Sequence, residues 1–281
     1  MNKIDLHLHS TFSDGIFDPF ELMKLAKDKG IRILSITDHD TIKAIDSSLK
    51  ISHKLGLDFI PGIEISSQLN STEIHLLAYY FDYKNKAILK LLEDIKLLRT
   101  IRAKEIVAKL NKIGFLINFS DVEKFSGSSP VCRPHIAEAL IKKGYVKNYA
   151  EAFRKYLYDS GPADVKKSFI SPSDVIKLIH KANGIVFIAH PLLLNDALID
   201  KLISFGVDGI EVIHPMHREK DIKKYKRLAE ENGLLQSGGS DFHGRDKRDY
   251  QNLGKYTIDE SNFNRMKKYY EGRFRSFNFT V

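Results

Sequence analysis

Histidine and carboxylate side chains recur along this chain where a β-strand is expected to run or to end. The first group is His7-Leu8-His9, in which side chains two residues apart lie on the same face of a strand. Two imidazoles on one strand face can bind a single divalent cation. The same spacing returns at Asp241-Phe242-His243, after a Gly-Gly-Ser run. Both motifs predict metal ligands, although polar residues on the solvent face of an edge strand would give the same pattern.

Three further positions place an ionisable side chain in an apolar strand or at its end. Glu64 and His75 each stand between apolar residues, and His190 follows the apolar run Val-Phe-Ile-Ala. A charged group in such a setting is unfavourable unless it is paired or bound to a cation. We therefore expect all three to be ligands. His53 and His180 fall inside expected helices instead and are not expected to bind metal.

Charged residues also crowd the end of a second expected strand, at Thr-Asp-His-Asp-Thr over residues 37–41. We expect His39 to be a ligand and Asp38 to orient a neighbouring imidazole. Asp40 is equally suited to cap the helix that follows. Asp14 precedes a glycine in a turn, where aspartate is common without any metal.

The elements that must position these residues alternate between strand and helix. Strands are expected at 3–9, 31–37, 58–66, 73–81, 184–189, 207–213 and 234–238, and helices at 19–29, 41–55, 85–114, 133–143, 149–157, from 172, 196–205 and 219–232. This alternation predicts a parallel α/β architecture, whose active site lies at the carboxyl ends of the strands. The alternation is interrupted by helices alone, so residues 100–168 are interpreted as a helical insert that contributes to the substrate pocket. Residues 1–99 and 169–281 then form the main domain.

Composition narrows the class of protein. The 281 residues suit one large α/β domain with an insert, and a formal charge of +8 favours anionic ligands such as nucleotides or RNA. A lysine-rich proteome would give the same charge. The single cysteine, Cys132, excludes an intrachain disulfide and a thiolate cluster. No run approaches the about 20 apolar residues of a membrane span, so we expect a cytoplasmic enzyme without membrane contact.

Taken in order, the motifs resemble the PHP (polymerase and histidinol phosphatase) superfamily over residues 3–257. They are His7-x-His9, Asp14, Asp38-His39, Glu64, His75, Ala189-His190-Pro191 and Gly239-Ser240-Asp241-Phe242-His243-Gly244. The closer resemblance is to the branch of nucleoside 3',5'-bisphosphate phosphatases and 5'-3' exoribonucleases. That branch also has a helical insert with an Arg-Pro-His element, present here as Arg133-Pro134-His135.

The resemblance implies a distorted (β/α)7 TIM-like barrel that holds two to three divalent metal ions. The implied ligand sets are His7, His9, Glu64 and Asp241 for the first metal, Asp14, His39 and His243 for the second, and Glu64, His75 and His190 for the third. Glu64 would bridge two of them. Ligands of this kind, without sulfur, suit manganese, iron or zinc.

Substrate residues are implied by the same resemblance. Arg133 would grip a phosphate group bidentately, and Lys167 would serve as a point charge, although the neighbouring Lys166 fits as well. His135 would bind phosphate or protonate the leaving alkoxide. Both Arg133 and His135 could also be ordinary residues of a first helical turn after Cys132. His214, where relatives often have tyrosine, and His217 are expected in the substrate pocket; a helix entry is the other role open to His217.

The expected activity is that of a metal-dependent phosphoric ester hydrolase acting on nucleotides. It would remove the 3'-phosphate of a nucleoside 3',5'-bisphosphate, or hydrolyse short RNA stepwise from 5' to 3', with a metal-bridged hydroxide as the attacking group. A histidinol-phosphate-type phosphatase and a non-catalytic module that binds metal or nucleic acid are the alternatives. The Arg133 element favours the first activity, and the complete set of ligand positions argues against the last. The sequence does not fix the metal, the preferred substrate or self-association.

Overall fold

The strands of the protein form two sheets. A computed structural model describes residues 3–70, 72–127, 129–165 and 170–274. The smaller sheet contains β1 (Lys3–Leu8), β2 (Ile31–Ile36) and β3 (Asp58–Phe59) in that order. The larger contains β4 (Gly62–Leu69), β5 (Thr72–Tyr79), β6 (Ile185–Ile188), β7 (Gly209–Ile213) and β8 (Leu235–Gly238).

One strand departs from the predicted parallel arrangement. β5 runs antiparallel to both of its neighbours, β4 and β6, whereas the remaining pairs within the sheets are parallel. Only two residues separate β4 from β5, too few for the crossover that parallel neighbours need. The prediction of an all-parallel sheet was therefore wrong at β5, which enters the sheet as the second arm of a hairpin.

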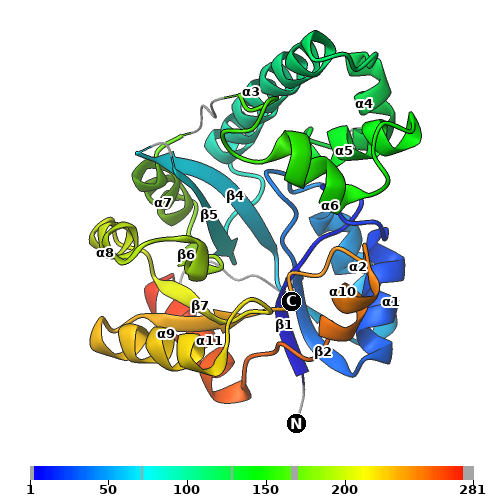
Figure 1. The fold of residues 1–281 in the computed structure, drawn as a ribbon. Coiled ribbons are helices and arrows are strands. Elements are labelled where there is room, and N and C mark those ends of the chain that lie inside the picture. Colours follow the sequence, from blue (N-terminus) through cyan, green and yellow to red (C-terminus); the bar gives the residue numbers. More distant parts are fainter. Residues whose placement is uncertain (1–2, 71, 128, 166–169, 275–281) are drawn as a thin grey trace.

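Two groups of helices surround these sheets (Figure 1). The helices of the main part are α1 (Pro19–Asp28), α2 (Ile45–Leu55), α7 (Pro172–Lys181), α8 (Asp196–Ser204), α9 (Glu219–Glu231), α10 (Lys247–Asn252) and α11 (Glu260–Arg273). Asp18 caps α1, because its carboxylate accepts hydrogen bonds from the main-chain nitrogens of Phe20 and Glu21. The predicted start of α2 at Thr41 was wrong. Asp40 does not cap a helix; its backbone is left-handed, with φ of 53°, and the helix begins at Ile45.

The second group gathers at the top of the view in Figure 1. It contains α3 (Lys86–Lys112), α4 (Phe119–Ser126), α5 (Arg133–Lys142) and α6 (Tyr149–Ala152), the last extended by a π-helical turn at Phe153–Leu157. These helices share a hydrophobic core of their own, which includes Ile106, Leu110, Ile136 and Leu140. We propose that they form the predicted insert. Helix α3 crosses its first boundary without a break, and the second lies outside the described residues.

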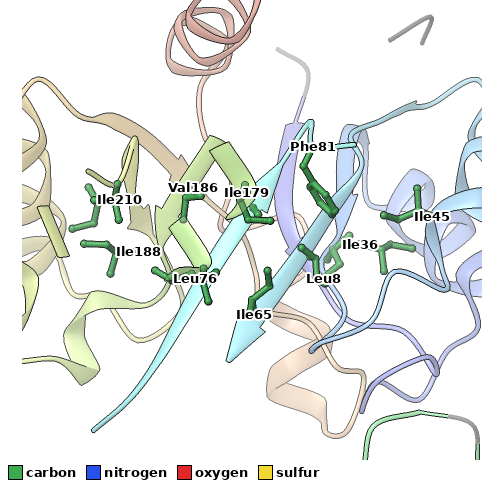
Figure 2. Close-up of a cluster of buried hydrophobic side chains, with 14 of the residues drawn as sticks. Leu8, Ile36, Ile45, Ile65, Leu76, Phe81, Ile179, Val186, Ile188 and Ile210 are labelled. Carbon is green, nitrogen blue, oxygen red and sulfur yellow. The ribbon is translucent and has the colours of Figure 1, made fainter. Parts of the chain in front are cut away.

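The main core lies between the sheets and the helices that cover them. Leu8, Ile36, Ile65, Leu76 and Ile188 are buried there, together with apolar residues of α2, α3 and α7 (Figure 2). This packing fixes the strands against their helices and holds the strand ends in place.

Main-chain hydrogen bonds join the two sheets at two places. The His9 nitrogen donates to the Phe242 oxygen at 3.0 Å, and the Asp40 nitrogen donates to the Glu64 oxygen at 2.9 Å. The first bond joins the segments after β1 and β8, and the second joins the loop after β2 to β4. These strands and loops carry the predicted ligands other than His75 and His190. Among the described residues, no helix has the length and apolar character needed to cross a membrane.

Candidate metal centre

The predicted ligands of the first metal lie close together, beside the main-chain hydrogen bonds that join the two sheets. The Nε2 atoms of His7 and His9 each lie 3.2 Å from Oε2 of Glu64. They also lie 3.3 and 3.1 Å from Oδ1 of Asp241. Ligand atoms from the four side chains fall within 4.8 Å of one another, close enough for one cation to touch them all.

A second group lies next to the first and contains Asp14, His39 and His243, with His9 in reach. Oδ1 of Asp14 lies 3.2 Å from Nε2 of His243 and 4.0 Å from Nε2 of His39. The rings of His9 and His243 stack with their centroids 4.2 Å apart. The structure thus brings together the three residues that the resemblance implies for the second metal.

Glu64 connects these groups to a third. Its Oε1 atom lies 2.8 Å from Nδ1 of His75 and 2.9 Å from Nε2 of His190. Its other oxygen lies 3.2 Å from Nδ1 of His39. One carboxylate therefore reaches ligand atoms of all three predicted sets.

The side chains fit divalent cations by their unsatisfied atoms as well as by their type. Both ring nitrogens of His9, Oδ1 of Asp14 and Nδ1 of His39 are buried without a hydrogen-bond partner among the described residues. Burying polar atoms in this way costs free energy that a bound cation would offset. Nitrogen and carboxylate ligands without sulfur suit manganese, iron or zinc.

The electrostatics keep these carboxylates ionised. Burial raises the pKa of Glu64, Asp14 and Asp241, but the surrounding imidazoles outweigh it and hold each pKa well below its ordinary value. Burial also opposes charging of His39 and lowers its pKa to about 3.

Several residues of the centre have unusual backbone conformations. The φ angles of Asp40, His190 and Asp241 are 53°, 28° and 49°. Positive φ is costly for residues with a side chain and persists where the surrounding structure imposes it. Glycine solves a related problem at position 239, because a Cβ atom there would lie 2.4 Å from Cβ of His7. The close approach of β8 to β1 thus requires glycine.

Two buried charged residues beside the centre were not predicted. Oε1 of Glu211 lies 2.9 Å from Nδ1 of His7, and Oε2 accepts a hydrogen bond of 2.7 Å from the main-chain nitrogen of His190. Arg99 of α3 binds Asp40. Glu211 carries the same signal as Glu64, an acidic residue between apolar neighbours in a strand, whereas no local pattern marks Arg99.

Asp38 plays a different part from the one predicted. Its carboxylate accepts hydrogen bonds from the main-chain nitrogen and hydroxyl of Ser10, at 2.7 and 2.6 Å, and from the hydroxyl of Ser13 at 2.6 Å. It therefore fixes the turn that carries Asp14 and makes no hydrogen bond to an imidazole in the part of the chain that the structure describes. As predicted, His53 and His180 lie apart from the centre: the first is exposed, and the second pairs with Asp208 at 2.7 Å.

A cavity of about 710 Å³ opens beside the third group. Its lining includes His75, His190 and Arg133, with Leu193 and Leu194 as apolar neighbours. The Arg133 guanidinium donates to the main-chain oxygen of Leu157 at 3.0 Å and to the carboxylate of Asp159 at 2.7 Å. The guanidinium of Arg133 thus lines the same cavity as the predicted metal ligands His75 and His190.

The other predicted substrate residues have varied surroundings. Nδ1 of His135 accepts from the Cys132 main-chain nitrogen at 3.1 Å, so Nε2 carries the proton and donates to the Ser13 oxygen at 3.1 Å. Contact with phosphate would require this ring to exchange partners. His214 lies 3.3 Å from Asp241. His217 donates a hydrogen bond from Nδ1 to the main-chain oxygen of Val212 at 2.9 Å.

Neither His214 nor His217 is among the described residues that line the cavity. Lys166 and Lys167 lie outside the described residues. The predicted contacts of these two histidines and two lysines with substrate stay predictions.

Comparison with known proteins decides the family. A model of the PHP domain matches residues 5–157. The chain belongs to the PHP family. A 5'-3' exoribonuclease of Haemophilus influenzae is 38% identical over 247 residues, which cover 86% of this PHP protein and 90% of that enzyme. A 3',5'-nucleoside bisphosphate phosphatase of Chromobacterium violaceum is 32% identical over 250 residues, covering 86% and 88% of the two chains.

Solved structures agree with this membership. A structure from Bifidobacterium adolescentis, described as a metal-dependent phosphoesterase, superimposes with a TM-score of 0.87 at 29% identity over 97% of this chain and 96% of its own. An amidohydrolase from Chromobacterium violaceum, with bound sulfate and no metal, gives a TM-score of 0.80 at 31% identity over 86% and 87% of the chains. The predicted resemblance is confirmed, and the chain is a metal-dependent phosphoesterase.

Proposed function

We propose that this PHP protein hydrolyses phosphate esters of nucleotides. The substrates would be the 3'-phosphate of a nucleoside 3',5'-bisphosphate and the phosphodiester bonds of short RNA, taken stepwise from the 5' end. The observation that carries the proposal is the cavity that Arg133 lines together with His75 and His190. The exoribonuclease and the bisphosphate phosphatase compared above support the same substrate class.

The ligand assignment is part of the proposal. His7, His9, Glu64 and Asp241 would hold one metal, Asp14, His39 and His243 a second, and Glu64, His75 and His190 a third. The grouping of their ligand atoms supports the first and second sets, and of the third set it includes Glu64 and His75. Bound divalent ions would polarise phosphate oxygens and lower the pKa of a water molecule.

The chain's own side chains would place the substrate. Arg133 presents a planar fork of donors that matches a phosphate group, once substrate competes with the exposed carboxylate of Asp159 for it. Leu193 and Leu194 give the cavity an apolar wall that suits the face of a base. His135 would hold the Ser13–Asp14 turn from beneath, and its neutral ring suits that role because burial lowers its pKa.

The architecture that supports this site is proposed to be the distorted (β/α)7 barrel that the resemblance implies. The hydrogen bonds that join β1 to the segment after β8, and the loop after β2 to β4, support it. The helical insert would then cover the mouth of the barrel and supply Arg133.

Hydrolysis of three compounds tests the function. Protein loaded with Mn²⁺ is incubated with a nucleoside 3',5'-bisphosphate, a short 5'-phosphorylated RNA and histidinol phosphate, with and without a chelator. We expect chelator-sensitive release of phosphate or mononucleotide from the first two. Release from histidinol phosphate alone would refute the nucleotide proposal, and release from none would favour a binding module.

The role of Arg133 has a separate test. Arg133→Ala should raise KM for the nucleotide about 10–100-fold, because a charge-assisted pair to phosphate is lost. Arg154→Ala, on the neighbouring turn and exposed, is the matched control. Equal KM values for Arg133→Ala and wild type would exclude Arg133 from phosphate binding.

A further inference from the structure

Arg99 joins the helical insert to the metal centre through a buried guanidinium. It lies on α3, and only 9% of its surface is exposed. Nε donates to Oδ2 of Asp40 at 2.6 Å, and Nη2 lies 2.5 Å from the same oxygen. Nη2 also donates to the hydroxyl of Ser66 at 2.7 Å. Burial and these hydrogen bonds hold the guanidinium in one orientation, so it does not act as a mobile surface charge.

Asp40 links Arg99 to the loop that carries His39 and to β4, which carries Glu64. It directly follows His39, and its other carboxylate oxygen accepts from the Ser66 main-chain nitrogen at 2.7 Å. Its own nitrogen donates to the oxygen of Glu64. Because the backbone of Asp40 is left-handed, the loop needs these contacts to keep its conformation and to aim His39.

A second set of contacts reaches the turn of Asp14. Nη1 of Arg99 donates to Sγ of Cys132 at 3.3 Å. Cys132 is the residue whose nitrogen binds His135, and the same imidazole donates to the oxygen of Ser13. The chain of contacts from α3 therefore ends beside the carboxylate of Asp14.

We propose that Arg99 is a positioning residue, through which the helical insert holds two of the three ligands of the second metal, Asp14 and His39. The inference rests on the proposed function only in requiring that the centre binds metal. The hydrogen bonds of Arg99 to Asp40, Ser66 and Cys132 act on the ligands indirectly, through Asp40 and through Cys132 with His135. Removal of Arg99 would free the loop of His39 and the turn of Asp14 together.

A set of variants separates positioning from simple charge burial. Arg99→Met leaves the Asp40 carboxylate buried and without its cation, which destabilises the fold. The double variant Asp40→Asn with Arg99→Met removes both charges and keeps an oxygen for the Ser66 nitrogen. Lys143→Met is the matched control, since Lys143 pairs with Asp121 at 2.6 Å within the insert.

The readouts are Mn²⁺ bound per chain, Mn²⁺ affinity from titration, thermal unfolding and the split between kcat and KM. In Arg99→Met and in the double variant we expect the weakest bound Mn²⁺ to lose about 10–100-fold in affinity, with a lower kcat that excess Mn²⁺ partly restores. The double variant should regain thermal stability without regaining Mn²⁺ affinity. Arg99→Lys should recover part of the affinity, and Lys143→Met should match wild type.

Two results would overturn the inference. One is a double variant that binds Mn²⁺ as wild type does, which would leave Arg99 only as the counter-charge of Asp40. The other is Arg99→Met with unchanged Mn²⁺ affinity and a lower melting temperature. If wild type binds Mn²⁺ and hydrolyses none of the three compounds, the proposed function fails while these binding measurements still decide the role of Arg99.

Discussion

Replacing Glu211 by glutamine tests how the ligands His7 and His190 are held. One carboxylate oxygen pairs with Nδ1 of His7 and the other accepts from the His190 main-chain nitrogen. Nδ1 must donate if Nε2 of His7 is to bind metal. Glu211 therefore accepts on both sides. A glutamine amide has one accepting oxygen and one donating nitrogen, so it can satisfy only one of these donors.

The size of the effect follows from that mismatch. A buried donor without its partner costs about 1–3 kcal/mol. Since about 1.4 kcal/mol corresponds to a factor of ten, metal affinity should fall about 5–150-fold if the whole cost falls on the metal-bound state. Glutamine can relieve part of the cost by pairing with His190, and His7 is then left in the wrong tautomer.

The assay is titration of the metal-free variant with Mn²⁺, together with thermal unfolding without metal. Asp208→Asn is the matched control. Asp208 is also a buried carboxylate next to β7, but its partners are His180, the Val186 nitrogen, Tyr269 and Arg273, none of which is a predicted metal ligand. We expect Glu211→Gln to weaken Mn²⁺ binding and Asp208→Asn to lower stability alone. Equal Mn²⁺ affinity in Glu211→Gln and wild type, or an equal loss in both variants, would refute the reasoning.

Three further predictions concern stability and metal. Burial raises the pKa of Asp208, but hydrogen bonds from His180 and Val186 outweigh it and hold the pKa below its ordinary 3.8. The metal-free wild type should therefore exceed Asp208→Asn in unfolding free energy above pH 4, and urea titrations should show this difference shrinking below that pH. Gly239→Ala should lower both melting temperature and Mn²⁺ content, because the new Cβ would meet His7; unchanged values would mean that β8 moves freely. Mn²⁺ at about 100 times its Kd should add about 2.7 kcal/mol to the unfolding free energy, and a chelator should remove this gain in calorimetry.

Much of the site could be predicted because its signals are local. Glu64 and His75 stand out as ionisable residues in apolar strands, and the structure places both among the ligand groups. Glu211 gives the same signal between Ile210 and Val212, so the rule that found Glu64 also identifies it. The order of these residues along the chain was enough to predict that they lie together, because strand ends gather at one edge of the sheets.

What could not be predicted depends on contacts between distant residues. Arg99 and Asp40 are 59 positions apart. Within its own segment, Arg99 looks like an ordinary helix residue and Asp40 like an ordinary helix cap. The direction of β5 was missed although the short connection between the strands implied it. The start of α2 moved because a tertiary ion pair outweighed the local preference of Asp40 for capping.

The reversed direction of β5 has a consequence for how the length of the chain can vary. A strand that runs backwards releases the chain at the edge opposite the metal centre, and α3 must carry it back. Its 27 residues span about 40 Å, with Ile88 and Ile95 in the main core and Ile106 and Leu110 in the core of the insert. Both the length of α3 and the direction in which its side chains point therefore matter for the contacts at its two ends. One residue inserted before Arg99 would turn that side chain by about 100° away from its partners, whereas insertions in the loops of the insert would leave the phase intact. Changes in length should therefore be tolerated in those loops and penalised in the first half of α3.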